Sequence, residues 1–261
     1  MMFAKDPIRV DTEKCVGCSL CVSDCPNGYL RLRDKKACVS EYAGCIECGH
    51  CFAICPQQAI VMKNYPASNE PTVPMTEIDG DVLLAAMKSR RTVRKFRAQD
   101  VEQSVLDKIL EAGRYCPTAT NAQDVNFTVL GNRKESIERE CVRLFRKGKR
   151  LASPFVSAVR NIEIDENFFF KKAPLVIVVS GRDKINAGLA SSYMELEAES
   201  LGLGVLYSGF FVICTKLSRK IRKMLELPKG DKVFSCMVMG YPAVKYQRIV
   251  PRKERRIKTL D

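Results

Sequence analysis

Eight of the 13 cysteines in this chain form two copies of one spacing. In each copy, two residues separate each of three cysteines, and a fourth cysteine follows after three more residues, directly before a proline. The copies are Cys15, Cys18, Cys21 and Cys25, and then Cys45, Cys48, Cys51 and Cys55. Thiolates are the donors that iron–sulfur centres prefer, and three closely spaced cysteines can hold one corner of a cubane. The pattern predicts two [4Fe-4S] clusters and one-electron chemistry.

The doubled spacing resembles that of the two-cluster bacterial ferredoxins. In that family the fourth cysteine of each run ligates the other cluster. The resemblance therefore implies two ligand sets, Cys15, Cys18, Cys21 and Cys55 for one cluster and Cys45, Cys48, Cys51 and Cys25 for the other. A disulfide framework and zinc knuckles are the alternatives, but the third cysteine of each run does not suit a zinc knuckle and no secretion signal is visible.

The elements that would position these cysteines form a small module over residues 1–64. Its two halves repeat after about 30 residues, and the apolar segments Tyr29–Leu32 and Ala59–Met62 predict short strands. Because so small a module has little apolar core, we expect the clusters themselves to keep it folded. Residues 65–78 contain three prolines and predict an extended linker. A second domain is expected over residues 79–261.

The second domain mixes helical and strand patterns without strict alternation, which predicts an α+β fold with a mixed sheet. Asp100 and Gln103 resemble a capping box that opens a helix ending near Gly113. The other predicted helices cover residues 81–88, 134–147, 186–201 and 215–225. The predicted strands cover residues 126–130, 174–180 and 233–239, the second of them central.

Three segments of this domain suit a phosphorylated cofactor with a planar ring. The arginines and the hydroxyl of residues 90–96 can hold a phosphate, with a solvated basic turn as the alternative. Asn121 and Gln123 stand two residues apart in a loop, and their amides can both donate and accept; an ordinary polar turn is the alternative there. Within residues 199–209, Gly202 and Gly204 indicate a helix end and a close backbone approach.

Taken together, these segments resemble the nitroreductase family of FMN-dependent oxidoreductases over about residues 80–255. The motifs that carry the resemblance are R-R-S-x-R-x-F/Y at residues 90–96, P-S-A-x-N-x-Q at residues 117–123, and the G-L-G helix end at residues 201–210. The resemblance implies an FMN site formed by Arg90, Arg91, Thr92, Arg94, Asn121, Gln123, Leu206, Ser208, Gly209 and Arg252.

Within that resemblance, the arginine segment and Arg252 hold the phosphate and ribityl end of FMN. Asn121 and Gln123 contact the ribityl chain or the ring, and the backbone from Leu206 to Gly209 approaches the ring. Thr118 and Asp124 depart from the family's usual loop. Ser208 stands where several members have glutamate, so the electron donor stays open between NAD(P)H and a low-potential, ferredoxin-like donor.

The whole chain resembles a ferredoxin–nitroreductase fusion. This implies an FMN-dependent oxidoreductase that takes single electrons through two clusters and reduces a small conjugated acceptor, such as a nitroaromatic or a quinone. The chemistry would take place at N5 of FMN, and no side chain is assigned as a catalytic acid. The alternative is an electron-transfer protein that serves a protein partner. Family members are usually intertwined homodimers, so we expect a homodimer.

The chain has a formal net charge of +13, unevenly distributed. Residues 1–65 hold eight Lys/Arg and seven Asp/Glu, and the remainder holds 35 and 23. A basic second domain suits nucleic acid, an acidic redox partner or a phosphorylated cofactor. No nucleic-acid motif is visible, so we expect no nucleic-acid binding. No apolar run approaches the roughly 18 residues of a membrane span. We therefore expect no membrane association and a cytoplasmic protein.

Overall fold

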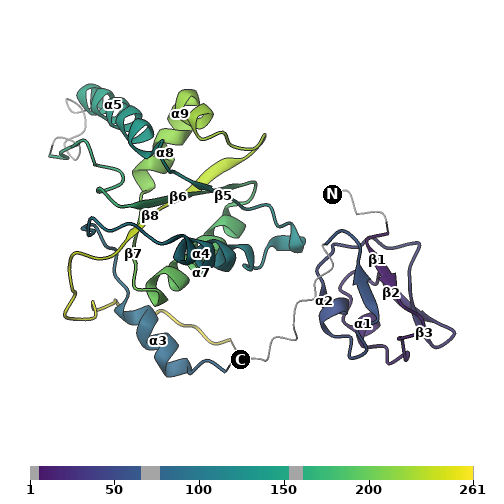
Figure 1. The fold of residues 1–261 in the computed structure, drawn as a ribbon. Coiled ribbons are helices and arrows are strands. Elements are labelled where there is room, and N and C mark those ends of the chain that lie inside the picture. The colour runs from purple at the N-terminus through teal and green to yellow at the C-terminus, as the bar shows by residue number, and fades with distance from the viewer. Residues whose placement is uncertain (1–5, 66–76, 153–160, 261) are drawn as a thin grey trace. The chain divides into compact units, whose positions relative to one another are not determined.

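The computed structural model describes residues 6–65, 77–152 and 161–260. The chain divides into two compact units, one formed by residues 1–77 and 118–122 and the other by residues 78–117 and 123–261 (Figure 1). Helices and strands occur in both units, which confirms the α+β class. The predicted linker lies almost wholly outside the described residues. Its extended form and the predicted boundaries at residues 64 and 79 stay predictions.

The N-terminal unit contains two small antiparallel sheets and two helices of a single turn. Strand β1 pairs with β4, and β2 pairs with β3. The two strands predicted from the apolar segments are confirmed as β2 and β4. The bounds are Ile8–Val10 for β1, Leu20–Ser23 for α1, Leu30–Arg33 for β2, Lys36–Val39 for β3, His50–Ala53 for α2 and Ile60–Met62 for β4.

The two cysteine runs share a backbone conformation as well as a spacing. Three pairs of matching positions have a left-handed φ in both runs: Gly17 (71°) and Glu47 (54°), Ser19 (67°) and Gly49 (75°), and Gly28 (61°) and Gln58 (49°). A residue with a Cβ adopts this conformation at a cost of about 1–2 kcal/mol, so Glu47, Ser19 and Gln58 need compensating interactions elsewhere. At Gly17 a Cβ would collide with the carbonyl of Lys35, and only glycine fits.

A four-stranded sheet in the order β5-β6-β8-β7 forms the centre of the C-terminal unit. These strands pair antiparallel throughout, and an isolated parallel bridge joins Thr92 to Val205 on β7. Every residue of β6 is buried, which confirms it as a central strand. The bounds are Asn126–Val129 for β5, Leu175–Gly181 for β6, Gly204–Tyr207 for β7 and Lys232–Gly240 for β8.

Helices cover both faces of this sheet (Figure 1). The bounds are Gly80–Ser89 for α3, Gln103–Arg114 for α4, Lys134–Ala152 for α5, Lys184–Ser200 for α7, Gly209–Leu217 for α8 and Arg219–Met224 for α9. Successive residues of β6 point to opposite faces. Ile177 and Val179 therefore pack with the α4–α7 layer, whereas Val176 and Val178 pack with α5, α8 and α9.

Three helix predictions differ from the structure. The helix predicted over residues 134–147 is longer, because α5 continues to Ala152. Helix α4 begins at Gln103 with Glu102 as its N-cap, so the predicted cap at Asp100 is wrong by two residues. The helix predicted over residues 215–225 is two helices, because Ser218 adopts an extended backbone (φ −122°, ψ 115°) and accepts from the N–H of Ile221 to cap α9. A serine hydroxyl that can cap a new helix competes with helix continuation.

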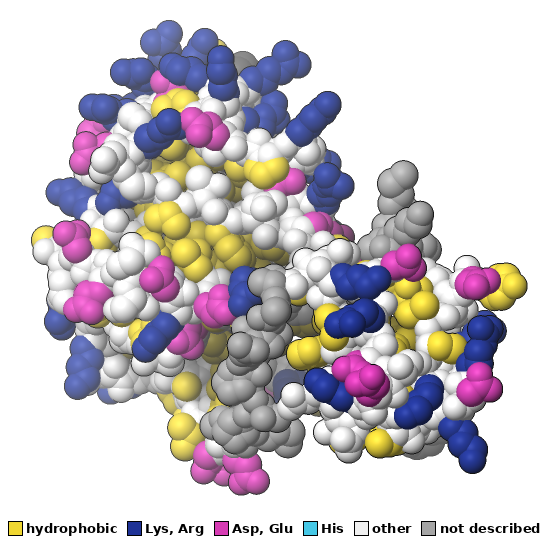
Figure 2. Space-filling view, turned by 45° about the vertical axis from the view of Figure 1, so that its right-hand side comes forward, with side chains coloured by type: hydrophobic (Ala, Val, Ile, Leu, Met, Phe, Trp, Pro, Cys, Tyr) yellow, Lys and Arg dark blue, Asp and Glu magenta, His cyan; other side chains and the backbone are white. Residues whose placement is uncertain are grey.

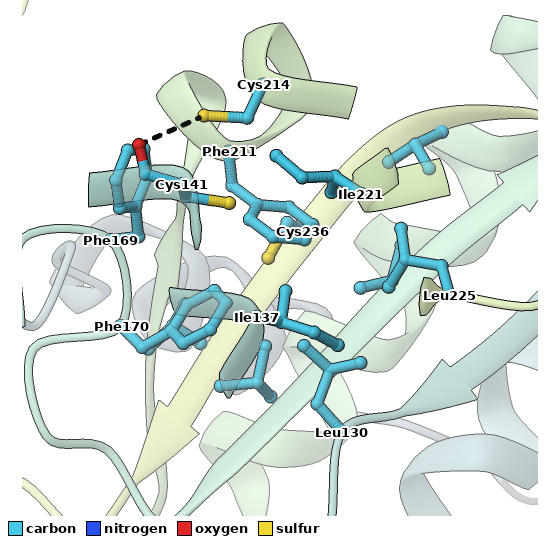
Figure 3. Packing of buried hydrophobic residues seen from close by; sticks show 14 of the residues in the cluster. Leu130, Ile137, Cys141, Phe169, Phe170, Phe211, Cys214, Ile221, Leu225 and Cys236 are labelled. Atoms are coloured by element: carbon cyan, nitrogen blue, oxygen red, sulfur yellow. Dashed lines mark hydrogen bonds between the residues drawn. The ribbon is translucent and has the colours of Figure 1, made fainter. Parts of the chain in front are cut away.

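Three of the five cysteines outside the motif lie in the core formed by α5, α8 and β8, one on each of these elements (Figure 3). Cys141, Cys214 and Cys236 surround Phe211, and each of them is at most 1% exposed. Burial among apolar side chains raises the pKa of Cys236 well above its ordinary value. These cysteines act as small apolar core residues, as predicted.

Basic side chains gather over α5 and α9. Figure 2 shows Lys and Arg side chains crowded at the top of the view, which is the height of these helices in Figure 1. The second half of α5 contains five cations and no acid: Arg143, Arg146, Lys147, Lys149 and Arg150. Glu140 pairs with Lys220 of α9 at 2.8 Å and with Arg143 at 3.3 Å. Part of the positive charge predicted for the second domain thus lies on the surface of α5 and α9.

We predict that Gly204→Ala destabilises the C-terminal unit, because the added Cβ would collide with Val93. Overpacking of this kind costs about 1–3 kcal/mol. Gly188→Ala is the matched control: nothing lies within 4 Å of its Cβ position in α7, and alanine favours a helix by about 1 kcal/mol. Anaerobic denaturant titrations should show a lower midpoint for the first variant and an equal or higher one for the second. Equal midpoints in both variants would contradict the close packing at Gly204.

Candidate functional site

The eight motif cysteines line two separate cavities in the N-terminal unit. One cavity is bordered by Cys15, Cys18, Cys21 and Cys55, and the other by Cys25, Cys45, Cys48 and Cys51. Within the described ranges, no three His, Cys, Asp or Glu side chains are arranged to hold a single metal ion. Four sulfur donors around a cavity suit a cluster of several irons. The grouping is the one that the ferredoxin resemblance implies, and ligation itself stays a prediction.

Backbone N–H groups already point at four of these sulfurs. The N–H of Ala37 donates to Cys15 Sγ (3.4 Å), and the N–H of Ala59 donates to Cys55 Sγ (3.3 Å). In the other set, Cys25 Sγ accepts from the N–H of Tyr29 (3.2 Å), and Cys45 Sγ accepts from that of Glu47 (3.3 Å). Hydrogen bonds to sulfur help to set the potential of an iron–sulfur cluster. Each ligand set therefore receives two of them.

The thiols of the cavities are partly desolvated. Burial, with smaller contributions from the neighbouring cysteines, raises the pKa of Cys51 to about 12 and also raises that of Cys21. Iron binds thiolates, so loading these sites releases protons. The single histidine of the chain, His50, has its Nδ1 3.5 Å from Oδ2 of Asp24. It borders the cavity of Cys25, Cys45, Cys48 and Cys51.

The predicted phosphate-binding segment follows α3 and lies along the free edge of β7. Thr92 forms the parallel bridge with Val205, and the N–H of Val93 donates to the Val205 carbonyl at 3.1 Å. Tyr246, from the segment after β8, donates its hydroxyl to the carbonyl of Thr92 at 3.1 Å. Arg91 and Thr92 are half-buried, and Arg94 is exposed.

The backbone predicted to approach the ring begins only a residue beyond this pairing. Leu206 lies on β7, Ser208 precedes α8, and Gly209 is the first residue of α8. The N–H of Ser208 donates to the carbonyl of Cys236 at 2.8 Å, which fixes the turn. The structure thus brings the arginine segment and the β7–α8 junction to one edge of the sheet.

The other predicted flavin residues are Asn121, Gln123 and Arg252. Asn121 belongs to the N-terminal unit, where its Nδ2 donates to the carbonyls of Ile46 (3.3 Å) and Glu47 (2.8 Å). Gln123 is exposed with a positive φ of 45°. Arg252 is exposed in the segment after β8. Their contacts with a flavin stay predictions.

Arg90 has an unexpected partner. Its Nη1 lies 2.6 Å from Oε1 of Glu195 on α7, and Tyr207 donates its hydroxyl to Oε2 of the same carboxylate at 3.3 Å. Glu195 is 8% exposed. Burial raises its pKa, and Arg90 and Tyr207 oppose that rise. Neither Tyr207 nor Glu195 was predicted from the sequence as a site residue. The glutamates four residues apart on α7, Glu195 and Glu199, were the only available signal.

Comparison with known proteins places this chain in a family. The model of the nitroreductase family matches residues 87–241, which is more than half of the chain, and the 4Fe-4S dicluster domain model matches residues 14–60. The chain belongs to the nitroreductase family. This family member is a flavin oxidoreductase of the nitroreductase type with an N-terminal 4Fe-4S dicluster domain, as the sequence predicted.

Individual relatives agree with this assignment. A protein of Methanothermobacter thermautotrophicus, named "Putative NADH dehydrogenase/NAD(P)H nitroreductase", is 30% identical over 64% of this chain and 82% of its own length. An FMN-bound nitroreductase from Desulfitobacterium hafniense has a TM-score of 0.57 at 20% identity, and the match covers 67% of this chain and 98% of that one. An FMN-bound nitroreductase from Bacteroides fragilis has a TM-score of 0.54 at 22% identity, with the same coverage. These two structures support the fold.

The prediction that the fourth cysteine of each run ligates the other cluster can be tested with paired substitutions. Cys15→Ala with Cys55→Ala alters one cavity only, so about four irons per chain should remain. Cys15→Ala with Cys25→Ala alters both cavities, and the iron content should fall towards zero. Anaerobic iron and sulfide analysis measures both. Cys38→Ala, outside the motif, is the control and should retain about eight irons. Retention of iron only in the Cys15/Cys25 variant would contradict this prediction.

Proposed function

We propose that this protein is an FMN-dependent oxidoreductase that receives single electrons through two [4Fe-4S] clusters and reduces a small conjugated acceptor. The observation that carries the proposal is the presence, in one chain, of two cavities each lined by four cysteines and a nitroreductase domain. When bound, the clusters supply one-electron transfer, and the flavin supplies the change from single electrons to pairs. The protein contributes binding, orientation and exclusion of water.

The edge of β7 suits FMN. Arg90, Arg91 and Thr92 provide two guanidinium groups and a hydroxyl for a phosphate. Gly209 begins α8, so its N–H has no acceptor within the helix. A Cβ built at Gly209 meets nothing within 4 Å, so a flat ring can approach the backbone there. The residue that directly precedes α8 is Ser208, which has a hydroxyl and no carboxylate.

Aromatic side chains beside this junction support a planar acceptor. Phe210 directly follows Gly209 and is 47% exposed. Its ring centroid lies 5.6 Å from those of both Phe145 and Phe168. Aromatic rings favour stacked and edge-to-face contacts with other conjugated rings. Phe169 and Phe170, at 1% and 0% exposure, belong to the core, so only the first residue of the Phe168–Phe170 run can border a substrate.

The electron donor in this proposal is either a ferredoxin-like protein or NAD(P)H, because the change to Ser208 leaves both open. A second candidate function is electron transfer to an acidic protein partner, which the basic surface of α5 and α9 favours through charge complementarity. Thiolate-ligated clusters suit a reducing compartment, so we also propose a cytoplasmic location. The structure contains no helix, within the ranges it describes, that could cross a membrane.

The homodimer expected from the resemblance also forms part of the proposal. All ten residues of α3 are exposed, although the helix contains Val82, Leu83, Leu84 and Met87. An apolar helix exposed on all sides is unusual for a monomer and marks an interface. The second copy is the proposed partner because both copies would then cover their α3 helices in one symmetric contact.

We predict that the protein elutes with about twice the 29.3 kDa mass of one chain in size-exclusion chromatography with light scattering. Leu84→Glu should shift the protein to the monomer, because a carboxylate cannot be buried against apolar side chains without a partner. Lys88→Glu at the end of the same helix is the control for added charge and should remain dimeric. A monomeric wild-type protein at micromolar concentration would contradict the dimer.

We further predict about eight irons and one FMN for each chain after anaerobic purification. Reduction bleaches the visible absorbance of the flavin and of the clusters. Addition of a quinone or a nitroaromatic to the reduced protein should restore this absorbance, because electrons leave to the acceptor. Stopped-flow absorbance measures this step. A protein with eight irons and no flavin would contradict the reductase function. Reoxidation only by a protein partner would favour the electron-transfer alternative.

A further inference from the structure

A group of four ionisable side chains lies directly behind the proposed phosphate site. Arg90 comes from the end of α3, Glu195 and Glu199 come from adjacent turns of α7, and Tyr207 comes from β7. Arg90 Nη1 is 2.6 Å from Glu195 Oε1. The hydroxyl of Tyr207 donates to the carbonyl of Ser191 at 3.0 Å and to Glu195 Oε2 at 3.3 Å. The carboxylate of Glu195 is thereby held from two sides.

Glu199 is the member of this group whose hydrogen bonding is not satisfied. Its Oε1 is buried and has no hydrogen-bond partner among the described residues. A buried carboxylate without a partner is costly when charged. Burial and then the charge of Glu195 raise the pKa of Glu199 to about 7, and Arg90 partly opposes this rise. Glu199 can therefore gain or lose a proton near neutral pH.

Among the described residues, Glu195 and Arg90 are the charged groups that act on this carboxyl in addition to burial. The cations and acids of α4 that lie near α7, namely Asp107, Lys108 and Glu111, border a different groove together with Glu197. From the sheet, β6 and β8 present Leu175, Ile177, Met237 and Met239 to the α7 side. Within the described part of the chain, the charge state of Glu199 depends on Arg90 and Glu195.

We propose that Glu195 positions Arg90 for the phosphate of FMN, and that Glu199 binds a proton when that phosphate arrives. The inference rests on the proposed FMN site. Glu195 occupies Nη1 of Arg90 and leaves the remaining N–H groups of the guanidinium for the ligand. Two carboxylates and an arriving phosphate dianion bring more negative charge than the guanidinium groups of Arg90 and Arg91 offset. A proton from solvent, bound to a Glu199 oxygen, removes one unit of that charge, and no electron moves.

The direction of the pH dependence follows from linkage. A nearby phosphate favours the protonated carboxyl, so the pKa of Glu199 is higher with FMN bound than the value of about 7 without it. Between these two values the complex holds more protons than the free protein, and FMN affinity falls as pH rises. The second pKa of a phosphate monoester lies near 6, so it does not contribute above about pH 7.

The test is an anaerobic titration of the full cluster-containing chain, freed of flavin, with FMN between pH 7 and 9. For the wild type we expect Kd to rise by up to about tenfold per pH unit in this range. Calorimetry in two buffers of different ionisation enthalpy should show proton uptake approaching one per FMN. Glu199→Gln should give a pH-independent Kd and no proton uptake. Glu197→Gln, on the same helix, is the control and should behave as the wild type.

Two substitutions of Glu195 test its positioning role separately from the role of Glu199. Glu195→Ala should raise Kd for FMN at pH 7, whereas Glu195→Gln keeps an oxygen for Arg90 and should restore much of the affinity. A pH-independent Kd in the wild type, or persistent proton uptake in Glu199→Gln, would overturn the inference while leaving FMN binding in place. Equal affinity in Glu195→Ala and the wild type would overturn the positioning role. A chain that binds no FMN at any pH would overturn the proposed function itself.

Discussion

The free edge of β7 accepts the segment that follows α3, and this pairing positions the proposed flavin site. Two contacts form it, the bridge of Thr92 with Val205 and the hydrogen bond from the N–H of Val93. Gly204 permits it, because any side chain there would collide with Val93. An edge strand carries unpaired backbone groups that must be covered. This segment covers them and pairs Thr92 with Val205, which precedes Ser208 and Gly209 by only a few residues. Arg90 and Thr92 therefore lie at the same edge of the sheet as Ser208 and Gly209.

The same pairing explains why a carboxylate could be buried behind the arginines. Once Arg90 is held at the end of α3, its guanidinium reaches α7 and ion-pairs with Glu195. A buried acid needs a charged and hydrogen-bonded partner to offset desolvation. Glu195 has both, whereas the inner oxygen of Glu199 has neither. The difference between these two glutamates, one helical turn apart, gives the site a group that titrates near neutral pH.

The N-terminal unit follows a different physical rule. Its strands are three or four residues long, and its small core includes several of the motif cysteines. Left-handed backbone at Ser19, Glu47 and Gln58 is costly without compensation. Metal binding by the thiolates contributes to the folding free energy. We expect this contribution to offset the cost of the left-handed backbone in the ligand loops. The clusters are therefore both the proposed redox centres and the expected source of stability for this unit.

The sequence by itself determined the features that depend on local spacing. The cysteine runs led to the ferredoxin resemblance, which implies the grouping of cysteines found around the two cavities. The apolar run before Ser180 predicted the buried strand β6, and the arginine and glycine motifs led to the nitroreductase family. Local signals failed where two local preferences compete, as at Ser218, whose hydroxyl caps a new helix in place of continuing the old one. The predicted helix start at Asp100 was also wrong, because a capping pattern in the sequence permits a helix to begin at that residue but does not require it.

Only the tertiary structure decided which distant residues meet. Arg90 and Glu195 are 105 residues apart in the chain, and no spacing rule connects them. Likewise, the sequence could not distinguish Phe168 from the two phenylalanines after it, because burial depends on the layer of helices above the sheet. Burial and long-range pairing set the charge state of Glu199 and the partner of Arg90. Both arise from desolvation and packing that form only when the sheet, α3 and α7 come together.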